Sequence, residues 1–309
     1  MNVSFKTRCR LFFEEIFYIS TSPWRSGEEK IRAKKLRDDI SLLISKEGGT
    51  SAALSSWEHN IRDIRRQIMK RDPRNFLHWH VVTYTMVHGA KKPELDYLKN
   101  DSQWGRWEKT LQESWVGHSK PYAYYPTSSG NQVHMVYHLA RYSETFPEIS
   151  FKNFSTIFEF GGGYGLLAKL ISGLGFHGTY IIFDLPEFNA LQEYYLSAHG
   201  IKVSRKPMRG PVVILLSNLD DLKKQFELTP TLDMFIALWS LSESPISVRE
   251  NIFARMPQPQ YWMIGYQEGF DGADNLRYFS ELKQKNNAVT WIEKDIPYLL
   301  KQHYLFGKK

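Results

Sequence analysis

The sequence predicts an α/β protein, with an open and mostly parallel sheet that follows an amino-terminal helical cap. β-rich runs and helical stretches alternate after residue 150, which favours parallel strands joined by right-handed helical crossovers. The last two β-rich runs are joined by a short loop around Pro297. That loop is too short for a parallel crossover, so the sheet should end in an antiparallel hairpin. We expect the cap over 1–149 and the α/β domain over 150–309.

The cap shows two helical patterns. Apolar residues recur at spacings of three and four from Ala53 through Trp57 and Ile61 to Ile68, which is typical of an amphipathic helix. A second helical pattern covers 131–142. The stretch between them, 115–130, is rich in Pro, Gly, Ser and aromatic residues and reads as a loop, which could close over a substrate.

The elements of the α/β domain follow from short apolar runs bounded by polar and glycine-rich turns. The near-continuous apolar character of the strands fits a sheet covered on both faces. We expect strands at 156–160, 179–184, 211–217, 232–239, 260–267, 289–293 and 298–307, and helices at 166–174, 187–199 and 247–256.

Composition excludes several protein classes. The chain has 309 residues, 42% of them hydrophobic and 24% charged, as in ordinary globular proteins. Its apolar runs, such as 212–216, are too short to span a bilayer, so no integral membrane segment is expected. A single cysteine excludes an internal disulfide framework and a cysteine-rich zinc site. No signal-peptide core is recognisable near Met1, and we expect a cytoplasmic protein.

The positive charge is concentrated in the first quarter of the chain. Residues 1–75 hold 16 of the 40 Lys and Arg and 10 of the 33 Asp and Glu, which leaves 24 and 23 for the remainder. Such an arm could serve an anionic partner, but a solvated helical face explains it more simply. Nucleic acid is therefore not the expected partner.

The strongest motif is the run Glu159-Phe160-Gly161-Gly162-Gly163-Tyr164-Gly165, between the first strand and first helix of the α/β domain. Glycines allow a sharp turn and close approach of the backbone to a ligand, and ligands of such sheets bind beyond the carboxyl ends of the strands. Asp184 ends the next strand, where its carboxylate could accept both hydroxyls of a ribose.

Two ligands fit this frame, a dinucleotide such as NAD and S-adenosylmethionine. The segment from Gly163 to Ala168 matches the dinucleotide pattern G-x-G-x-x-A. Glu159 favours the second ligand, because a carboxylate there would repel a pyrophosphate and attract the ammonium group of a methionine.

The motifs EFGGGYG and YIIFDLPEF resemble the first two motifs of class I S-adenosylmethionine-dependent methyltransferases, with their Rossmann-like sheet. Further stretches, RDPRNFLHW, SSGNQVHMVYHL, QEYYL, LWSLSESP and HYLFG, are similar to the bacterial sugar O-methyltransferase family. The resemblance covers residues 55–309.

The resemblance implies a set of cofactor-binding residues. Glu159, Gly161, Gly163 and Gly165 would line the methionine half, and Asp184 would hold the ribose. The remaining positions are Leu185 against the adenine, Ser217 or Asn218 at its edge, and Trp239 and Ser240 closing the cleft.

Methylation of a hydroxyl needs alignment and benefits from a general base. The candidates are Glu243 after the fourth strand, Glu268 after the fifth, and His134, which shares a helix face with His138. Candidate substrate residues are Tyr124, Tyr125, Asn131, His138, Asp271 and His303. No metal ligand is assigned.

The predicted function is O-methylation of a sugar or glycan intermediate, for example in polysaccharide biosynthesis. The acceptor would be a small-molecule or carrier-linked sugar, and a homo-oligomer is left open. One alternative is an NAD(P)-dependent oxidoreductase, although no Tyr-x-x-x-Lys pair follows Tyr194 or Tyr195. The other is a non-catalytic nucleic-acid-binding protein, supported by the basic arm.

Overall fold

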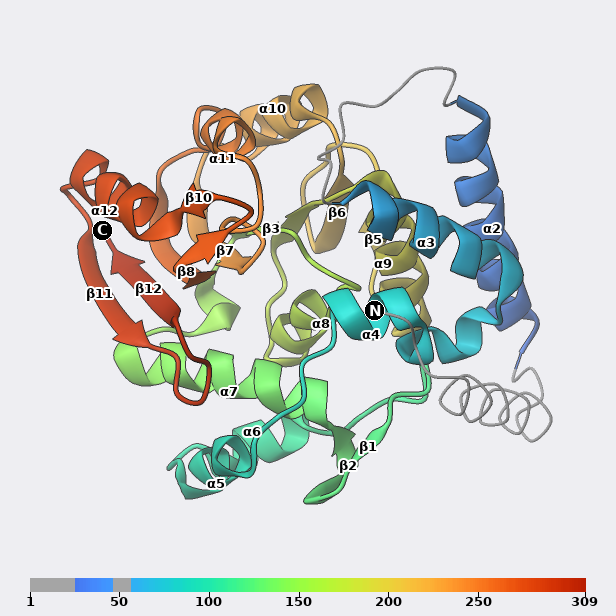
Figure 1. Cartoon of the computed structure of the whole chain (residues 1–309), viewed down its shortest axis with the longest axis horizontal. Coiled ribbons are helices and arrows are strands. Elements are labelled where there is room, and N and C mark those ends of the chain that lie inside the picture. Colours follow the sequence, from blue (N-terminus) through green and yellow to red (C-terminus); the bar gives the residue numbers. More distant parts are fainter. Residues whose placement is uncertain (1–25, 47–56) are drawn as a thin grey trace.

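The computed structural model describes residues 26–46 and 57–309. Its centre is an eight-stranded sheet with the order β11-β12-β8-β7-β3-β4-β6-β5 (Figure 1). The strands are β3 (Thr156–Phe160), β4 (Thr179–Phe183), β5 (Val203–Ser204), β6 (Val212–Leu216), β7 (Leu232–Leu238), β8 (Pro259–Gln267), β11 (Thr290–Asp295) and β12 (Gln302–Lys308).

The pairing confirms the predicted sheet. β5, β6, β4, β3, β7 and β8 are all parallel neighbours. β12 then runs antiparallel to β8 and pairs antiparallel with β11. The sheet is therefore Rossmann-like and ends in the expected antiparallel hairpin. The short edge strand β5 was not predicted, because two residues carry no periodicity.

Apolar residues alternate between two cores on the two faces of the sheet. Ile157 belongs to one core and Phe158 to the other, as the two-residue period of a strand requires. One face is covered by α8 (Leu166–Gly173), α9 (Pro186–Ala198) and the cap; the other is covered by α10 (Leu219–Leu228), α11 (Ile246–Phe253) and α12 (Asn275–Lys285) (Figure 1).

Two of these helices were missed in the sequence. α10 and α12 have polar compositions, and they start at Asn218 and Asp274, whose side chains accept hydrogen bonds from the backbone N–H groups of Asp221 and Arg277. Asn and Asp are favoured helix caps for this reason. The two-stranded hairpin of β9 (Gly269–Phe270) and β10 (Ala273–Asp274) was also not predicted.

The amino-terminal part is mainly helical, as expected. The amphipathic stripe forms α3, which begins at Glu58, so Trp57 is its cap and Ala53 lies outside the described residues. The elements are α2 (Gly27–Lys46), α3 (Glu58–Lys70), η1 (Pro73–His78), α4 (His80–Thr85), α5 (Lys92–Asn100), α6 (Trp104–Thr110), β1 (Pro121–Tyr122), β2 (Tyr125–Ser129), α7 (Gly130–Thr145) and η2 (Phe151–Asn153).

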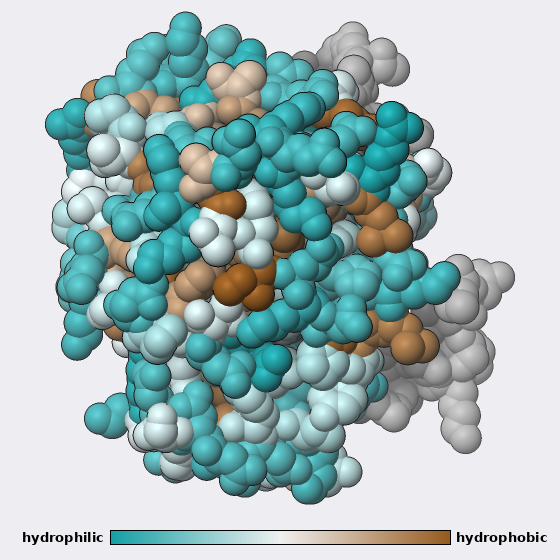
Figure 2. All heavy atoms as spheres, turned by 90° about the vertical axis from the view of Figure 1, so that its left-hand side faces the viewer, coloured by the Kyte–Doolittle hydropathy of each residue, from teal (hydrophilic) through white to brown (hydrophobic). Residues whose placement is uncertain are grey.

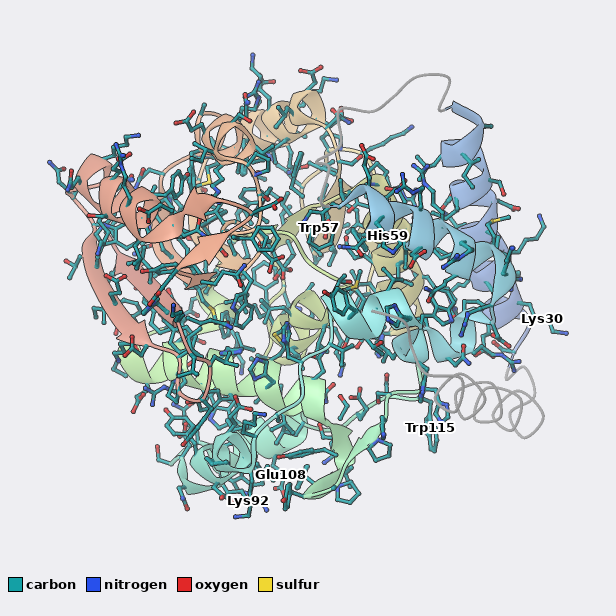
Figure 3. The ribbon with its side chains drawn as sticks, viewed as in Figure 1. Lys30, Trp57, His59, Lys92, Glu108 and Trp115 are labelled. Atoms are coloured by element: carbon teal, nitrogen blue, oxygen red, sulfur yellow. The ribbon has the colours of Figure 1, made fainter. Side chains whose placement is uncertain are left out.

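The aromatic residues of the cap divide into packed and exposed ones. Trp107 is fully buried, whereas Trp115 is 67% exposed and lies at the edge of the molecule in Figure 3. The predicted loop at 115–130 contains the antiparallel hairpin β1–β2. On the face drawn in Figure 2, hydrophilic residues predominate and apolar ones are scattered.

The cap and the sheet share one apolar core. A single cluster of buried residues runs from Ala33 on α2 through Val136 on α7 to Phe306 on β12. The change in sequence character near residue 150 marks a change of architecture, and the core continues across it. Within residues 26–46 and 57–309, no helix is long and apolar enough to cross a membrane.

Candidate active site

The glycine turn leaves β3 and lies against the end of β7. Gly161, Gly163 and Gly165 have φ of 76°, 55° and 95°, in the left-handed region that favours glycine. A Cβ added to Gly161 would be 2.3 Å from Ser240 Cβ. The Ser240 hydroxyl in turn donates to the carbonyl of Phe160. The turn can therefore pack this closely against Ser240 only because Gly161 has no side chain.

Asp184 follows β4 and lies beside the turn, as predicted. Its carboxylate accepts hydrogen bonds from the backbone N–H of Leu185 at 2.7 Å and from Gln192 Nε2 at 2.9 Å. Gln192 Nε2 also donates to the carbonyl of Gly163 at 2.9 Å. Gln192 thus joins Asp184 to the turn; it was missed as a site residue, since a glutamine within a helix gives no local signal.

Glu159 and Asp184 are two acids in a desolvated position. Burial raises the pKa of Glu159 to about 8 and that of Asp184 to about 7. The charge of Asp184 raises the pKa of Glu159 further, while a 2.9 Å hydrogen bond from the Tyr180 hydroxyl opposes the shift. In the described part of the chain neither acid forms a salt bridge. A ligand that brings a cation or hydroxyl donors would stabilise their ionised forms.

The residues predicted to contact the adenine are less clearly grouped around one place. Leu185 is partly buried at the start of α9, and Ser217 is exposed after β6. Asn218 is also exposed, and its amide caps α10 through Asp221. The Asn218 side chain therefore has a structural role that the sequence prediction did not assign.

Trp239 directly follows β7 and faces a group of histidines from the cap. Its φ of 65° is unusual for a bulky residue, and such backbone strain is found at functional sites. The indole ring is 5.3 Å from the rings of both His88 and His138 and 6.0 Å from that of His134. The Trp239 indole N–H donates to Gln302.

A buried chain of hydrogen bonds runs behind Trp239. Glu94 accepts a bond from the backbone N–H of Lys91 at 2.8 Å, and its other oxygen lies 2.9 Å from His134 Nδ1. His134 Nε2 lies 2.9 Å from His138 Nε2, and His138 Nδ1 contacts the Tyr304 hydroxyl. Burial holds the pKa of His138 well below 6.5.

This chain argues against direct contact of His134 or His138 with a substrate. The two side chains are 2% and 0% exposed, and all four ring nitrogens have partners. When both rings are neutral, His134 donates to Glu94, His138 donates to His134, and Tyr304 donates to His138. The spacing of four correctly placed them on one helix face, but that face is turned into the core.

His88 was missed by the sequence reasoning. It lies in the segment between α4 and α5, is exposed to solvent, and packs against Trp239 and His134. Desolvation by the surrounding protein, together with the neighbouring His134, lowers the pKa of His88 to about 4. The ring nitrogens have no hydrogen-bond partner among the described residues. His88 is therefore a neutral imidazole at pH 7 whose ring nitrogen can accept a hydrogen bond, and its low pKa makes it a weak base.

Asn131 joins His88 to the glycine turn. Its side-chain oxygen accepts a bond from the backbone N–H of His88 at 2.8 Å, and its Nδ2 donates to the Tyr164 hydroxyl at 2.9 Å. Asn131 is 4% exposed. It therefore positions groups of the site and is poorly placed to bind a substrate itself.

Three further candidates follow β7 and β8. Glu243 is partly buried, its carboxylate has no hydrogen-bond or ion-pair partner within the described residues, and burial raises its pKa to about 7. Glu268 lies 3.4 Å from His303, which also contacts Asp295 at 2.9 Å. Asp271 is exposed at the tip of the β9–β10 hairpin.

The predicted aromatic contacts lie on the β1–β2 hairpin. Tyr124 is 58% exposed and lies edge-on to Tyr122, while Tyr125 packs against Trp104 beneath Lys99. Tyr124 is thus the more accessible of the two predicted substrate residues. Over the described stretches, no group of three or more His, Cys, Asp or Glu is arranged to hold a metal ion.

The chain has only distant resemblance to known proteins. No family model and no curated protein matches it. Solved structures align with it, including an O-methyltransferase family protein from Burkholderia thailandensis with 16% identity, 70% of each chain covered and a TM-score of 0.36.

Two further structures align similarly. An rRNA methylase from Streptococcus thermophilus has 13% identity, with 50% of this chain and 86% of that chain covered, at a TM-score of 0.36. TrmK of M. capricolum, solved with S-adenosyl-homocysteine, has 14% identity, with 55% and 67% covered, at a TM-score of 0.35. These values are too low to assign a function, and the fold rests on the strand order itself.

Proposed function

We propose that this protein is an S-adenosylmethionine-dependent O-methyltransferase. The observation that carries the proposal is the glycine turn after β3, held against Ser240 on one side and joined to Asp184 through Gln192 on the other. The turn lies at the carboxyl ends of parallel strands, where such sheets bind nucleotide-like ligands.

The residues present suit this cofactor. Asp184 would accept ribose hydroxyls, and Glu159 keeps one carboxylate oxygen without a partner among the described residues. Two desolvated acids beside the turn favour a ligand carrying positive charge over one carrying a pyrophosphate. When bound, S-adenosylmethionine supplies an already activated methyl group.

The acceptor side needs a group that removes a proton from a hydroxyl. His88 is one candidate on geometric grounds, because it is solvent-facing and packed against Trp239, although its pKa of about 4 makes it a weak base. Its Nδ1 or Nε2 would accept the hydroxyl proton while the protein holds the acceptor oxygen in line with the methyl group. Glu243, with its raised pKa, is the second candidate.

A sugar hydroxyl is the proposed acceptor. The motif resemblance to the sugar O-methyltransferase family supports this choice, and so do the exposed rings of the β1–β2 hairpin, because aromatic side chains can cover the apolar face of a sugar. Polysaccharide biosynthesis and a cytoplasmic location belong to the same proposal.

The test is calorimetric titration of the full chain with S-adenosylmethionine, S-adenosylhomocysteine and NADH. We expect micromolar binding of both sulfur compounds, lost in Asp184→Asn and kept in Asp220→Asn, which alters an exposed carboxylate at the start of α10. Binding of NADH alone, lost in Asp184→Asn, would return the protein to the oxidoreductase alternative. Methyl transfer to a panel of free and nucleotide-linked sugars then tests the acceptor.

A further inference from the structure

A surface hollow, separate from the glycine turn, lies between α6, η2, α8 and the segment that follows α8. Its volume is about 690 Å³. The charged residues that line it are Arg106, Lys109, Lys152 and Lys169, and no carboxylate lines it. His177 and the polar residues Thr110 and Gln112 complete the polar part of the wall.

The four cations lack strong acidic partners. Lys109 and Lys152 are exposed and form no salt bridge within the described residues. Arg106 donates to the neutral Gln103 at 3.0 Å and lies over the ring of Trp107.

Lys169 is the most enclosed of the four. It donates to the neutral Gln132 at 2.9 Å. Burial lowers the pKa of both Arg106 and Lys169, while Asp101 and Glu113 act on them from outside the hollow. An anion in the hollow would restore the solvation that these side chains have lost.

A second surface hollow of the same protein provides a comparison. It has a volume of about 640 Å³ and is lined by Lys206 and Lys224 together with Asp221 and Glu227. Lys224 lies 3.3 Å from Asp221. Hollows of this size on this protein can therefore be balanced in charge, and the cationic one is not.

The preference of cations for the carboxyl ends of helices does not explain all four cations of the hollow. Cations are favoured in the last turn of a helix, which accounts for Lys109 at the end of α6. Lys169 is in the middle of α8, and Lys152 belongs to η2 with its aliphatic part over Gly175. Three separate segments thus direct cations to one place.

We propose that this hollow binds the diphosphate group of a small soluble molecule. Its volume falls in the range of about 300–1,000 Å³ typical of small-molecule sites. Cations converging on one concavity suit a compact anion, whereas a nucleic-acid surface tracks an extended backbone. Arginine and lysine both bind phosphate oxygens through charge-assisted hydrogen bonds.

This binding site does not depend on the methyltransferase proposal. α8 runs eight residues from Leu166 to Gly173 after its cap Gly165, so the glycine turn and the far end of the hollow lie about 12 Å apart along the helix. Pyrophosphate binding can therefore be measured without cofactor and without any catalytic assay.

The experiment is calorimetric titration of the full chain with inorganic pyrophosphate, orthophosphate and a single-stranded oligonucleotide at two salt concentrations. We expect saturable pyrophosphate binding, tighter than that of orthophosphate and weakened by salt. Lys109→Gln combined with Lys152→Gln should weaken it about tenfold or more, through the loss of two charge-assisted bonds.

The matched control is Lys206→Gln combined with Lys224→Gln, which removes the same charge from the balanced hollow. Unchanged pyrophosphate affinity in this control supports the proposal. An equal loss in both double variants, equal affinity for orthophosphate, or oligonucleotide binding without pyrophosphate binding would each overturn it. Thermal unfolding of each variant checks that the fold is intact.

Discussion

The glycine turn after β3 and the histidine group behind Trp239 are built in opposite ways. The turn is one contiguous segment in which the backbone packs closely against neighbouring groups because side chains are missing. The histidine group comes from separate segments of the cap, and its side chains fill the space. Burial acts on both regions, and it raises the pKa of the acids beside the turn while lowering the pKa of the histidines.

The glycine turn and the histidine group are therefore stabilised in two different ways. Stability at the turn depends on backbone conformations that favour glycine, and the methyl group of a single added side chain can disturb them. Stability at the histidine group depends on a buried polar network, where each partner that is removed leaves another group without one. The predictions below act on one region at a time.

The largest effect is expected at Glu94. Glu94→Ala leaves the buried His134 Nδ1–H without an acceptor and also removes the acceptor of the Lys91 N–H, and the free energy of unfolding should fall by about 4 kcal/mol. Urea denaturation measures this change. Glu108→Ala on the exposed face of α6 (Figure 3) is the control and should change little. A loss at Glu94 no greater than at Glu108 would contradict the buried network.

At the turn, Gly161→Ala should lower the free energy of unfolding by about 3 kcal/mol. The new Cβ meets Ser240, and the alanine must also adopt the φ of 76° that Gly161 has. Gly200→Ala is a matched control, since its φ is 72° but no atom lies within 4 Å of the added Cβ. It should lose only about 1 kcal/mol. Equal losses would mean that backbone strain alone explains the effect.

His88 should affect catalysis more than stability. His88→Gln removes a solvent-facing base and should lower kcat about 100-fold while the midpoint of thermal unfolding changes little. His80→Gln, an exposed histidine in the same part of the cap, is the control. Because the pKa of His88 is about 4, wild-type activity should be constant above about pH 5 and fall below it. A profile that falls at pH 6.5 would exclude His88 as the base.

The two regions should also respond to pH with opposite signs, by a few degrees in melting temperature. The pKa of folded His138 lies far below its unfolded value of 6.5, so its contribution is complete above that pH and is lost as the pH falls. The pKa of Glu159 is raised from 4.5 to about 8, so its contribution is complete at low pH and is lost as the pH rises through 8.

Calorimetry between pH 5.5 and pH 9 tests these signs. Glu159→Gln should flatten the alkaline side of the stability curve, and His138→Gln should flatten the acidic side. If Glu159→Gln leaves the alkaline side unchanged, the raised pKa of Glu159 is not the source of the loss.

The same contrast explains what could be predicted from the sequence. Strands β3, β4, β6, β7 and β8 were predicted to within one residue at either end, since buried parallel strands are continuous apolar runs. The turn and Asp184 were predicted because a local motif specifies them. Helices α10 and α12 were missed, because their many polar residues obscure the helical spacing of the apolar ones. Only the N-cap residues indicate where these helices begin.

The histidine side could not be predicted in the same way. His88 has no motif, and its importance comes from Trp239 and His134, which are distant in sequence. His134 and His138 were chosen for their spacing, but spacing does not reveal whether a helix face meets solvent or core. Tyr304, 166 residues from His138, decides that question.

The apolar core shared by α2, α7 and β12 has a consequence for the use of truncated forms of the protein. A fragment that begins near residue 150 would expose the inner side of the sheet and lose its largest apolar contact surface, so it should aggregate on expression. Chimaeras that exchange the cap with that of another protein would need compensating changes on both sides of the junction. Roles of the cap are therefore better mapped by point substitutions in the intact chain than by truncation.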